Sequence, residues 1–250
     1  MKIEIKNLDY RIGKKQLLNN ISMEFSGKRM IGLLGPNGSG KTTLLRHLYR
    51  ELPSKGAVCV DGQDIADCNR RALAQKIAVM AQRMSQTDSG LTVSDIVQMG
   101  RYPYKGLLEQ YDEQDERMVE EALARTGLTE LRHRRLGTMS GGEVQRAMIA
   151  KCFVQDPEVI ILDEPTNHLD IKYKLELMQL LTDYDGLVIL TLHDLDLAAR
   201  YCDYLYILKD GSLCAEGKPA EVLTEELLEQ VFEVHFHVMR DGDQIYLNIG

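Results

Sequence analysis

A glycine-rich segment, Gly35 to Thr43, constrains the fold of this chain more than any other feature. Its sequence, Gly-Pro-Asn-Gly-Ser-Gly-Lys-Thr-Thr, matches the pattern G-x-x-x-x-G-K-[ST]. The segment follows an apolar run, residues 30–34, and precedes a stretch with the leucine spacing of a helix, residues 44–48. A strand, a tight loop and a helix in this order are the context of a phosphate-binding loop. The sequence therefore predicts an α/β fold of the P-loop type.

The residue types in this loop suit a polyphosphate. Its three glycines let backbone N–H groups turn inward, and the N-terminus of the following helix adds partial positive charge. Lys41 brings a full positive charge to the β- and γ-phosphates, Thr42 is placed to bind Mg²⁺, and Thr43 adds a second hydroxyl. A glycine-rich turn that only happens to precede a helix is the alternative. We expect the whole loop to bind nucleotide: Gly35, Pro36, Asn37, Gly38, Ser39, Gly40, Lys41, Thr42 and Thr43.

Length and charge limit the classes of function. A chain of 250 residues can form one large α/β domain, or a core domain with a smaller inserted lobe. A net charge of −8 argues against nonspecific attraction to nucleic acid or anionic lipid, so we expect no nucleic-acid partner. No apolar run approaches the ~20 residues of a membrane span, and Met1–Ile5 alternates like a strand instead of a signal peptide. We therefore expect a cytoplasmic location.

Strand-like and helical patterns alternate along most of the chain. We expect strands at 2–9, 16–25, 30–34, 57–60, 77–80, 159–162, 187–192, 204–208, 234–239 and 244–249, and helices at 70–75, 93–99, 113–126, 142–155, 171–181, 195–201 and 225–231. The first two strands form an antiparallel flank, and the alternating elements form a parallel sheet. Residues 83–156 show only helical spacing. They are predicted to be a helical subdomain inserted into a sheet lobe of residues 1–82 and 157–250.

Polar side chains follow three of the predicted sheet strands. Asp163 and Glu164 come after one strand, His193 after another, and Gln82 after a third. Ligands of α/β sheets bind at the carboxyl ends of strands. Asp163 can hold Mg²⁺ and Glu164 can polarise an attacking water, while Gln82 can reach both metal and water. His193 can contact the γ-phosphate. An acidic pair after a strand is common, so this interpretation depends on the phosphate loop in the same chain.

Two aromatic segments leave alternatives open. Tyr10 ends the first strand, where its ring can stack on a purine or simply be half-buried packing. The segment Gly100–Gly106 contains two tyrosines and a proline, a composition that suits a protein contact, but an ordinary surface loop has the same signals.

With these residues in view, the sequence resembles ATP-binding cassette (ABC) ATPases over nearly its whole length. Ser140-Gly141-Gly142-Glu143 is similar to the family's signature motif, between Walker A at the phosphate loop and Walker B at 159–164. Further similarity lies in Gln82 (Q-loop), Asn167–Asp170 (D-loop), His193 (switch histidine) and Tyr10 (A-loop). Met139 and Glu143 depart from the leucine and glutamine usual there, and neither change removes a phosphate contact.

The resemblance implies a RecA-like core and a head-to-tail homodimer of cassettes that encloses two ATP molecules with Mg²⁺. In that dimer, residues of one chain face the nucleotide bound to the other chain: Ser140, Gly141, Gly142, Glu143 and Asp170. Thr42, Gln82 and Asp163 are the implied metal ligands, and Glu164, Gln82 and His193 the implied catalytic residues. Closure of the dimer would deliver helix-dipole charge to the γ-phosphate and exclude water.

Within the family, three stretches are similar to the ATPases of iron-siderophore, haem and vitamin B12 importers: 92–97, 100–103 and 163–171. This similarity implies two transmembrane permease subunits docked near residues 83–106, an indirect link to a substrate-binding protein, and a place at the cytoplasmic face of the membrane.

The alternatives to an importer ATPase are a translation-associated cassette protein, a chromosome-structure ATPase and a nucleotide-gated scaffold. The first needs a second cassette and a basic linker, and the second a long heptad insertion, which the sequence lacks. Glu164 and His193 speak against the third.

Overall fold

The computed structural model describes residues 1–81, 90–106, 109–167, 169–242 and 244–250. Contacts divide the chain into two compact units, Met1–Cys68 with Leu181–Gly250, and Asn69–Leu180. Gln82, a predicted catalytic residue and metal ligand, lies outside the described residues, as does His168. None of the helices in the described ranges has the length and apolar character needed to cross a membrane.

An antiparallel sheet opens the first unit. Strands β1 (Lys2–Ile12) and β2 (Lys15–Ser26) pair along their length, and the sheet has the order β2-β1-β4-β5 with β4 (Val58–Val60) and β5 (Gln63–Asp64). Ile3 and Ile5 are buried while the neighbouring Glu4 and Lys6 are less so, as an alternating pattern requires. The predicted antiparallel flank is confirmed.

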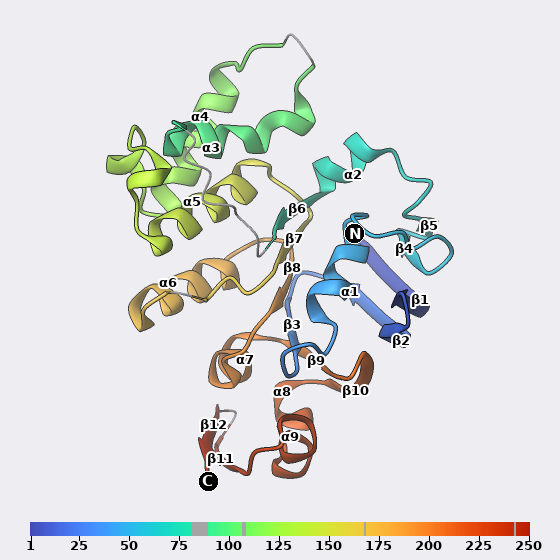
Figure 1. The fold of residues 1–250 in the computed structure, drawn as a ribbon. Helices are drawn as coiled ribbons and strands as arrows, with labels where there is room; N and C mark the ends of the chain where they lie inside the picture. Colours follow the sequence, from blue (N-terminus) through green and yellow to red (C-terminus); the bar gives the residue numbers. More distant parts are fainter. Residues whose placement is uncertain (82–89, 107–108, 168, 243) are drawn as a thin grey trace. The chain divides into compact units, whose positions relative to one another are not determined.

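Strand β3 (Met30–Leu34), which precedes the phosphate loop, is central to the other sheet of this unit. It lies parallel to β8 (Leu187–Thr191) and β9 (Tyr204–Lys209) (Figure 1). All five of its residues are buried. Burial on both faces explains the unbroken apolar run. Helices α1 (Lys41–Leu48) and α7 (Leu195–Tyr201) follow β3 and β8. Strand β10 (Ser212–Gly217), antiparallel to β9, was not predicted because its small and polar residues lack apolar alternation.

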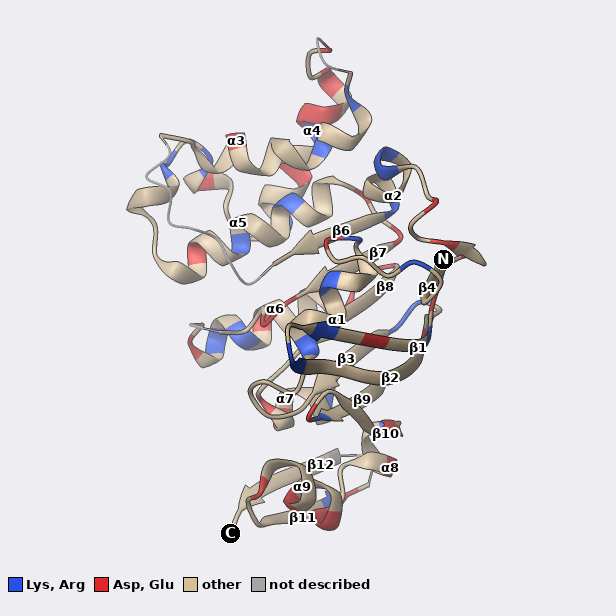
Figure 2. Ribbon diagram, turned by 45° about the vertical axis from the view of Figure 1, so that its right-hand side comes forward, with Lys and Arg blue, Asp and Glu red and all other residues tan. Residues whose placement is uncertain are grey.

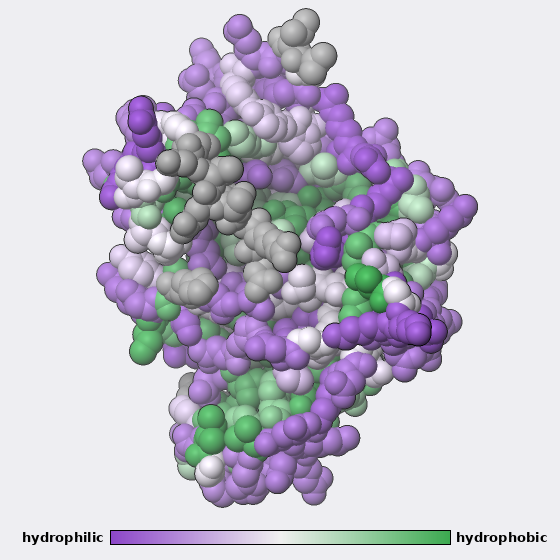
Figure 3. Space-filling view, viewed as in Figure 1, coloured by the Kyte–Doolittle hydropathy of each residue, from purple (hydrophilic) through white to green (hydrophobic). Residues whose placement is uncertain are grey.

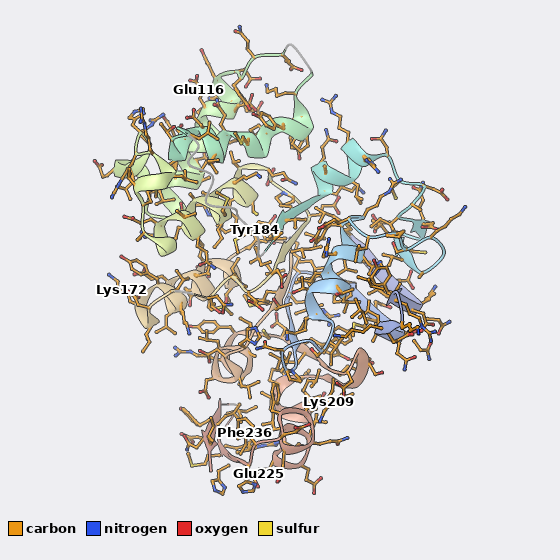
Figure 4. All side chains as sticks on the ribbon, in the orientation of Figure 1. Glu116, Lys172, Tyr184, Lys209, Glu225 and Phe236 are labelled. Carbon is orange, nitrogen blue, oxygen red and sulfur yellow. The ribbon has the colours of Figure 1, made fainter. Side chains whose placement is uncertain are left out.

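The C-terminal part of the first unit comprises helices α8 (Pro219–Val222) and α9 (Glu225–Phe232) and the hairpin β11 (Phe236–Asp241) with β12 (Gln244–Ile249). Lys209 Nζ on β9 donates to the Gln230 carbonyl at 2.7 Å and to Glu233 at 2.8 Å, which ties the end of α9 to the sheet (Figure 4). Hydrophobic side chains gather over this region (Figure 3), where four are exposed: Val234, Met239, Tyr246 and Ile249.

The second unit contains the parallel pair β6 (Ile77–Met80) and β7 (Val159–Leu162). Its helices are α2 (Arg70–Lys76), α3 (Val93–Gln98), α4 (Glu113–Arg125), α5 (Gly141–Val154) and most of α6 (Ile171–Thr182), with 3₁₀ helices at Met99–Tyr104, Thr129–Leu131 and Leu136–Thr138. The helices predicted within residues 83–156 are present. The subdomain boundaries at 83 and 156 stay a prediction.

The segment Gly100–Gly106 differs from its prediction as a surface segment. Arg101 is only 8% exposed, and its guanidinium donates to Asp115 Oδ1 at 2.9 Å and to the Val154 carbonyl at 3.1 Å. Lys105 also pairs with Asp115 of α4, a helix that carries several acidic residues (Figure 2). Burial raises the pKa of Asp115, but the hydrogen bonds from Lys105 and Arg101 outweigh it and hold this pKa below its usual value. Arg101 is therefore an internal residue.

Gly100 is also buried, and a Cβ atom there would lie 2.3 Å from the Lys151 carbonyl oxygen. The prediction of a contact surface is wrong for Gly100 and Arg101. Tyr102 remains available: its side chain is 59% exposed and stacks on Tyr111 with ring centroids 6.4 Å apart.

We expect Arg101→Ala to lower the free energy of unfolding by about 3 kcal/mol, because it removes one partner of a buried ion pair. The exposed Arg117, on the same unit's helix α4, is the matched control, and Arg117→Ala should change it by less than about 0.5 kcal/mol. Urea denaturation measures both. Equal small losses in the two variants would show that the buried pair is not a structural anchor.

Candidate functional site

The phosphate loop has the geometry its sequence predicts. Gly35, Gly38 and Gly40 have φ angles of 143°, 81° and 103°, which side chains rarely allow. Lys41 Nζ folds back over the loop and donates to the carbonyls of Gly35 at 2.7 Å and Pro36 at 3.1 Å. The loop is thus closed on itself, with the ammonium group held against the carbonyls of its first two residues.

The beginning of α1 is suited to an anion. Its N-cap residue is Gly40, which has no side chain to satisfy the first amides, and no acidic residue lies in the first turn. Ser39 is 2% exposed, and within the described chain its hydroxyl oxygen has no hydrogen-bond partner. Figure 2 shows Lys and Arg on this helix. A helix start without a side-chain cap, a buried hydroxyl and a lysine together fit the phosphates of a nucleotide.

Two segments distant in sequence hold the loop. A Cβ atom at Gly40 would lie 2.8 Å from Leu18 Cδ2 and 2.9 Å from the Leu17 carbonyl oxygen, so β2 passes directly against the loop. The Gly211 N–H, in the turn between β9 and β10, donates to the Ser39 carbonyl at 3.1 Å. The loop therefore depends on close backbone approach on two sides.

His193 and Tyr10 belong to the same unit as this loop. Strand β8 runs parallel to β3, with Thr191 opposite Leu33, so His193 follows at the sheet edge where β3 enters the loop. Its side chain is exposed. Tyr10 is half-buried on β1 between two irregularities of strand pairing, and its ring contacts His47 of α1 edge-on, with centroids 4.7 Å apart. Irregular pairing can turn a side chain away from the direction that a regular strand would give it.

The carboxylates lie in the second unit, at the end of β7. Asp163 is 6% exposed, and its N–H donates to the Met80 carbonyl at 2.9 Å. Glu164 is half-buried with φ of 54°, a strained conformation for a side chain of this size. Asn167 Nδ2 donates to the Glu164 carboxylate, and Gln145 Nε2 donates to the Glu164 carbonyl at 3.5 Å. The Glu164 side chain thus has a positioning partner that the sequence analysis missed.

The Ser140–Glu143 segment begins helix α5 with a reciprocal cap. Ser140 Oγ accepts from the Glu143 N–H at 3.3 Å, while the Glu143 carboxylate accepts from the Ser140 N–H at 2.8 Å and from its hydroxyl at 2.9 Å. These hydrogen bonds, the backbone one above all, lower the pKa of Glu143. The predicted nucleotide-binding serine is therefore bonded to the carboxylate three residues later.

The Asn167–Asp170 segment lies close to this helix start. A Cβ atom at Gly142 would be 3.0 Å from Leu169 Cδ2, so a small residue at position 142 is needed for the contact. Asp170 Oδ1 accepts from the Tyr173 N–H at 3.0 Å and so stabilises the start of α6. Glu143 and Asp170 both have structural roles within this unit, and their predicted contact with nucleotide stays a prediction.

The structure thus shows two groups of predicted residues. The first unit brings together the phosphate loop, His193 and Tyr10, and the second contains Asp163, Glu164, Ser140–Glu143 and Asp170. That both groups act on one nucleotide, and that Gln82 joins them, stays a prediction. A phosphate loop between a buried parallel strand and a helix defines the class of P-loop nucleotide-binding proteins.

Comparisons with known proteins agree with this class. The family model described as ABC transporter matches residues 18–167. The petrobactin import ATP-binding protein FpuD of Bacillus anthracis is 38% identical over 96% of this chain and 89% of that protein, and the ferric enterobactin transport ATP-binding protein FepC of Escherichia coli (strain K12) is 36% identical over 92% and 86%. The dimeric structure of MJ0796, a bacterial ABC transporter cassette, has a TM-score of 0.76 with 27% identity over 87% of this chain and 98% of that one. The chain belongs to the ABC transporter family, as its ATP-hydrolysing cassette.

We expect Gly40→Ala to destabilise the chain more than Gly38→Ala, by roughly 1–3 kcal/mol. Both alanines are strained by a positive φ, but only the Cβ at position 40 overlaps neighbouring atoms, since nothing lies within 4 Å at position 38. Urea denaturation without nucleotide compares them. Identical losses would mean that β2 does not press on the loop.

Proposed function

We propose that this chain is the ATP-hydrolysing subunit of an importer that takes up an iron chelate, a ferric siderophore above all. The uncapped glycine start of α1 behind Lys41 is the observation on which the nucleotide chemistry depends. Siderophore import in the names of the related proteins supports the class of substrate. The chelate itself would pass through two membrane subunits and never touch this chain. The cassette would sit at the cytoplasmic face of the membrane through those subunits.

In the proposed cycle, ATP binds first to the loop of the first unit. Lys41 releases the Gly35 and Pro36 carbonyls and turns to the β- and γ-phosphates, and the amides of the loop and of α1 donate to the same oxygens. Tyr10 stacks on the purine. Magnesium, when bound, neutralises charge between these phosphates. Thr42, Asp163 and Gln82 would hold it through hydroxyl, carboxylate and amide oxygens, the hard donors that this ion prefers.

Hydrolysis depends on Glu164 as general base. Its carboxylate orients a water molecule toward the γ-phosphorus and takes its proton as the bond to ADP breaks, which leaves ADP and inorganic phosphate. Asn167, which bonds the same carboxylate, fixes its direction. His193, at the edge of the sheet beside the loop, contacts the γ-phosphate and senses its loss.

Closure of two copies brings Ser140 of one chain to the γ-phosphate held by the other. Gly141 and Gly142 allow the phosphate to approach the α5 amides, while Glu143 and Asp170 border the same position. Because Glu143 now accepts from both the N–H and the hydroxyl of Ser140, these bonds exchange for bonds to phosphate on closure. The cassette dimer of a relative supports this arrangement.

We expect Glu164→Gln to bind ATP like the wild type, to lose at least about 100-fold in turnover, and to remain dimeric with ATP, because glutamine has the shape of the base but cannot accept the proton. Phosphate release and size-exclusion chromatography with ATP and Mg²⁺ measure these effects. Wild-type hydrolysis would rule out Glu164 as the base.

Lys41→Ala tests whether the phosphate loop is the site that binds ATP. It removes the charge at the mouth of the loop, so we expect both ATP affinity and turnover to fall, the affinity by about tenfold or more. Isothermal titration with ATP makes the measurement. Undiminished affinity would place the nucleotide elsewhere in the chain.

We expect Tyr102→Ala to reduce uptake of a labelled ferric chelate by about tenfold in cells that contain the membrane subunits, without changing the ATPase rate of the purified chain. The reason is that Tyr102 is exposed and stacked on Tyr111, as a contact residue would be. Tyr246→Ala, at another exposed tyrosine, is the control and should transport normally. Equal uptake by both variants would remove this surface from the docking site.

A further inference from the structure

Helix α1 carries a buried histidine that the nucleotide chemistry above does not use. His47 is 0% exposed and lies between Leu44, Leu45 and Leu48, which are buried as well. Across the described ranges, no group meets hydrogen-bond geometry with either Nδ1 or Nε2 of its ring. The helix that begins in the phosphate loop therefore encloses two polar atoms that lack a hydrogen bond of good geometry.

Such a histidine is unfavourable for folding. A buried polar group without a partner loses its hydrogen bonds to water and gains none in return, whereas an apolar side chain of similar size has no such loss. Burial also lowers the pKa of His47 to about 4, and it outweighs a weak hydrogen bond with the Pro53 backbone, which acts in the opposite direction. The ring is consequently neutral at physiological pH, and it adds no charge beside the phosphate loop.

What His47 does contact is the ring of Tyr10. The two ring planes meet at 77° with centroids 4.7 Å apart, the edge-to-face arrangement that aromatic pairs favour. Tyr10 itself lies between two irregularities of the β1–β2 pairing and is only half-buried. A side chain at such a position has freedom that an aromatic neighbour can remove. This contact joins the strand of Tyr10 to the helix of the phosphate loop.

We propose that His47 is a positioning residue for the nucleotide base: its neutral ring fixes the Tyr10 ring in the orientation that stacks on the purine. The inference rests on the proposed stacking role of Tyr10. It assigns His47 no contact with ATP. Its effect should therefore appear in binding of the base and not in binding of the phosphates.

The test replaces the imidazole by uncharged, apolar side chains. His47→Leu removes the ring and the two unsatisfied nitrogens, so the melting temperature should stay unchanged or rise, while the Kd for ATP rises about three- to tenfold, the range of an aromatic pair. His47→Phe restores a ring and should return the Kd to within about twofold of wild type. Inorganic tripolyphosphate is the matched ligand, because it lacks a base, and its Kd should be the same in all three proteins. Isothermal titration measures both ligands.

Two results overturn the inference while leaving nucleotide binding intact. One is a wild-type Kd for ATP in His47→Leu. The other is an equal loss for ATP and tripolyphosphate, which would indicate a distorted phosphate loop and hence a structural role. If His47→Phe does not fold, these two readouts of the leucine variant still decide.

Tyr10→Ala separates failure of this inference from failure of the proposed function. It should weaken ATP about tenfold or more, as loss of one stacked base predicts, without affecting tripolyphosphate. The double variant with His47→Leu should then bind ATP no more weakly than Tyr10→Ala alone, since His47 acts only through Tyr10. Wild-type affinity in Tyr10→Ala would overturn the stacking role and the inference together. A strong effect of Tyr10→Ala with none for His47→Leu would overturn the inference alone.

Discussion

The absence of a side chain at Gly35 is the constraint on which the nucleotide site depends. A Cβ atom at this position would lie 2.1 Å from the Leu208 carbonyl oxygen and 2.8 Å from Ser39 Oγ. Only glycine lets the end of β3 pass so close to β9 and turn back with positive φ. Lys41 then reaches the Gly35 carbonyl, and α1 begins one residue after a second tight glycine. The position of the Lys41 ammonium group thus depends on the close approach of the backbones of β3 and β9 at Gly35.

Two helices begin with glycine-containing segments, and their N-termini differ in one physical respect. Helix α1 has a glycine N-cap and no acid in its first turn, so no side chain of the cap residue accepts from its first amides. Helix α5 has a complete cap, since Ser140 and Glu143 satisfy each other. In the proposed cycle the first helix can bind phosphate alone. The second helix binds phosphate only when a phosphate replaces the Glu143 carboxylate at Ser140. In that cycle the closure of the dimer would therefore depend on the γ-phosphate of ATP.

How much the sequence predicted depends on the range of the interactions. The strand and helix on either side of the phosphate loop, the buried strands and the antiparallel flank follow from local spacing, and these predictions of structure are confirmed. Binding of nucleotide by the individual loop residues stays a prediction. The burial of Arg101 could not be predicted from local spacing, because its partners are Asp115 and the Val154 carbonyl, 14 and 53 residues away. The bond from Asn167 to Glu164 needs the turn that brings them together. His47 lies within the leucine pattern of the predicted helix, and nothing in that pattern marks it as special. Only its burial and its contact with Tyr10 in the structure indicate a role.

The choice of residue at position 47 can be argued from charge. A lysine or a protonated histidine one turn and a half from Lys41 would attract the same phosphates and compete with the loop for them. A leucine would be neutral but would offer no ring edge to Tyr10. A phenylalanine would be neutral and aromatic, but its ring is larger than imidazole, and a closely packed site resists added volume. Neutral imidazole combines a small ring with no charge. Burying its two nitrogens without good hydrogen bonds is unfavourable for folding, and we infer that this loss is tolerated because the ring orients Tyr10.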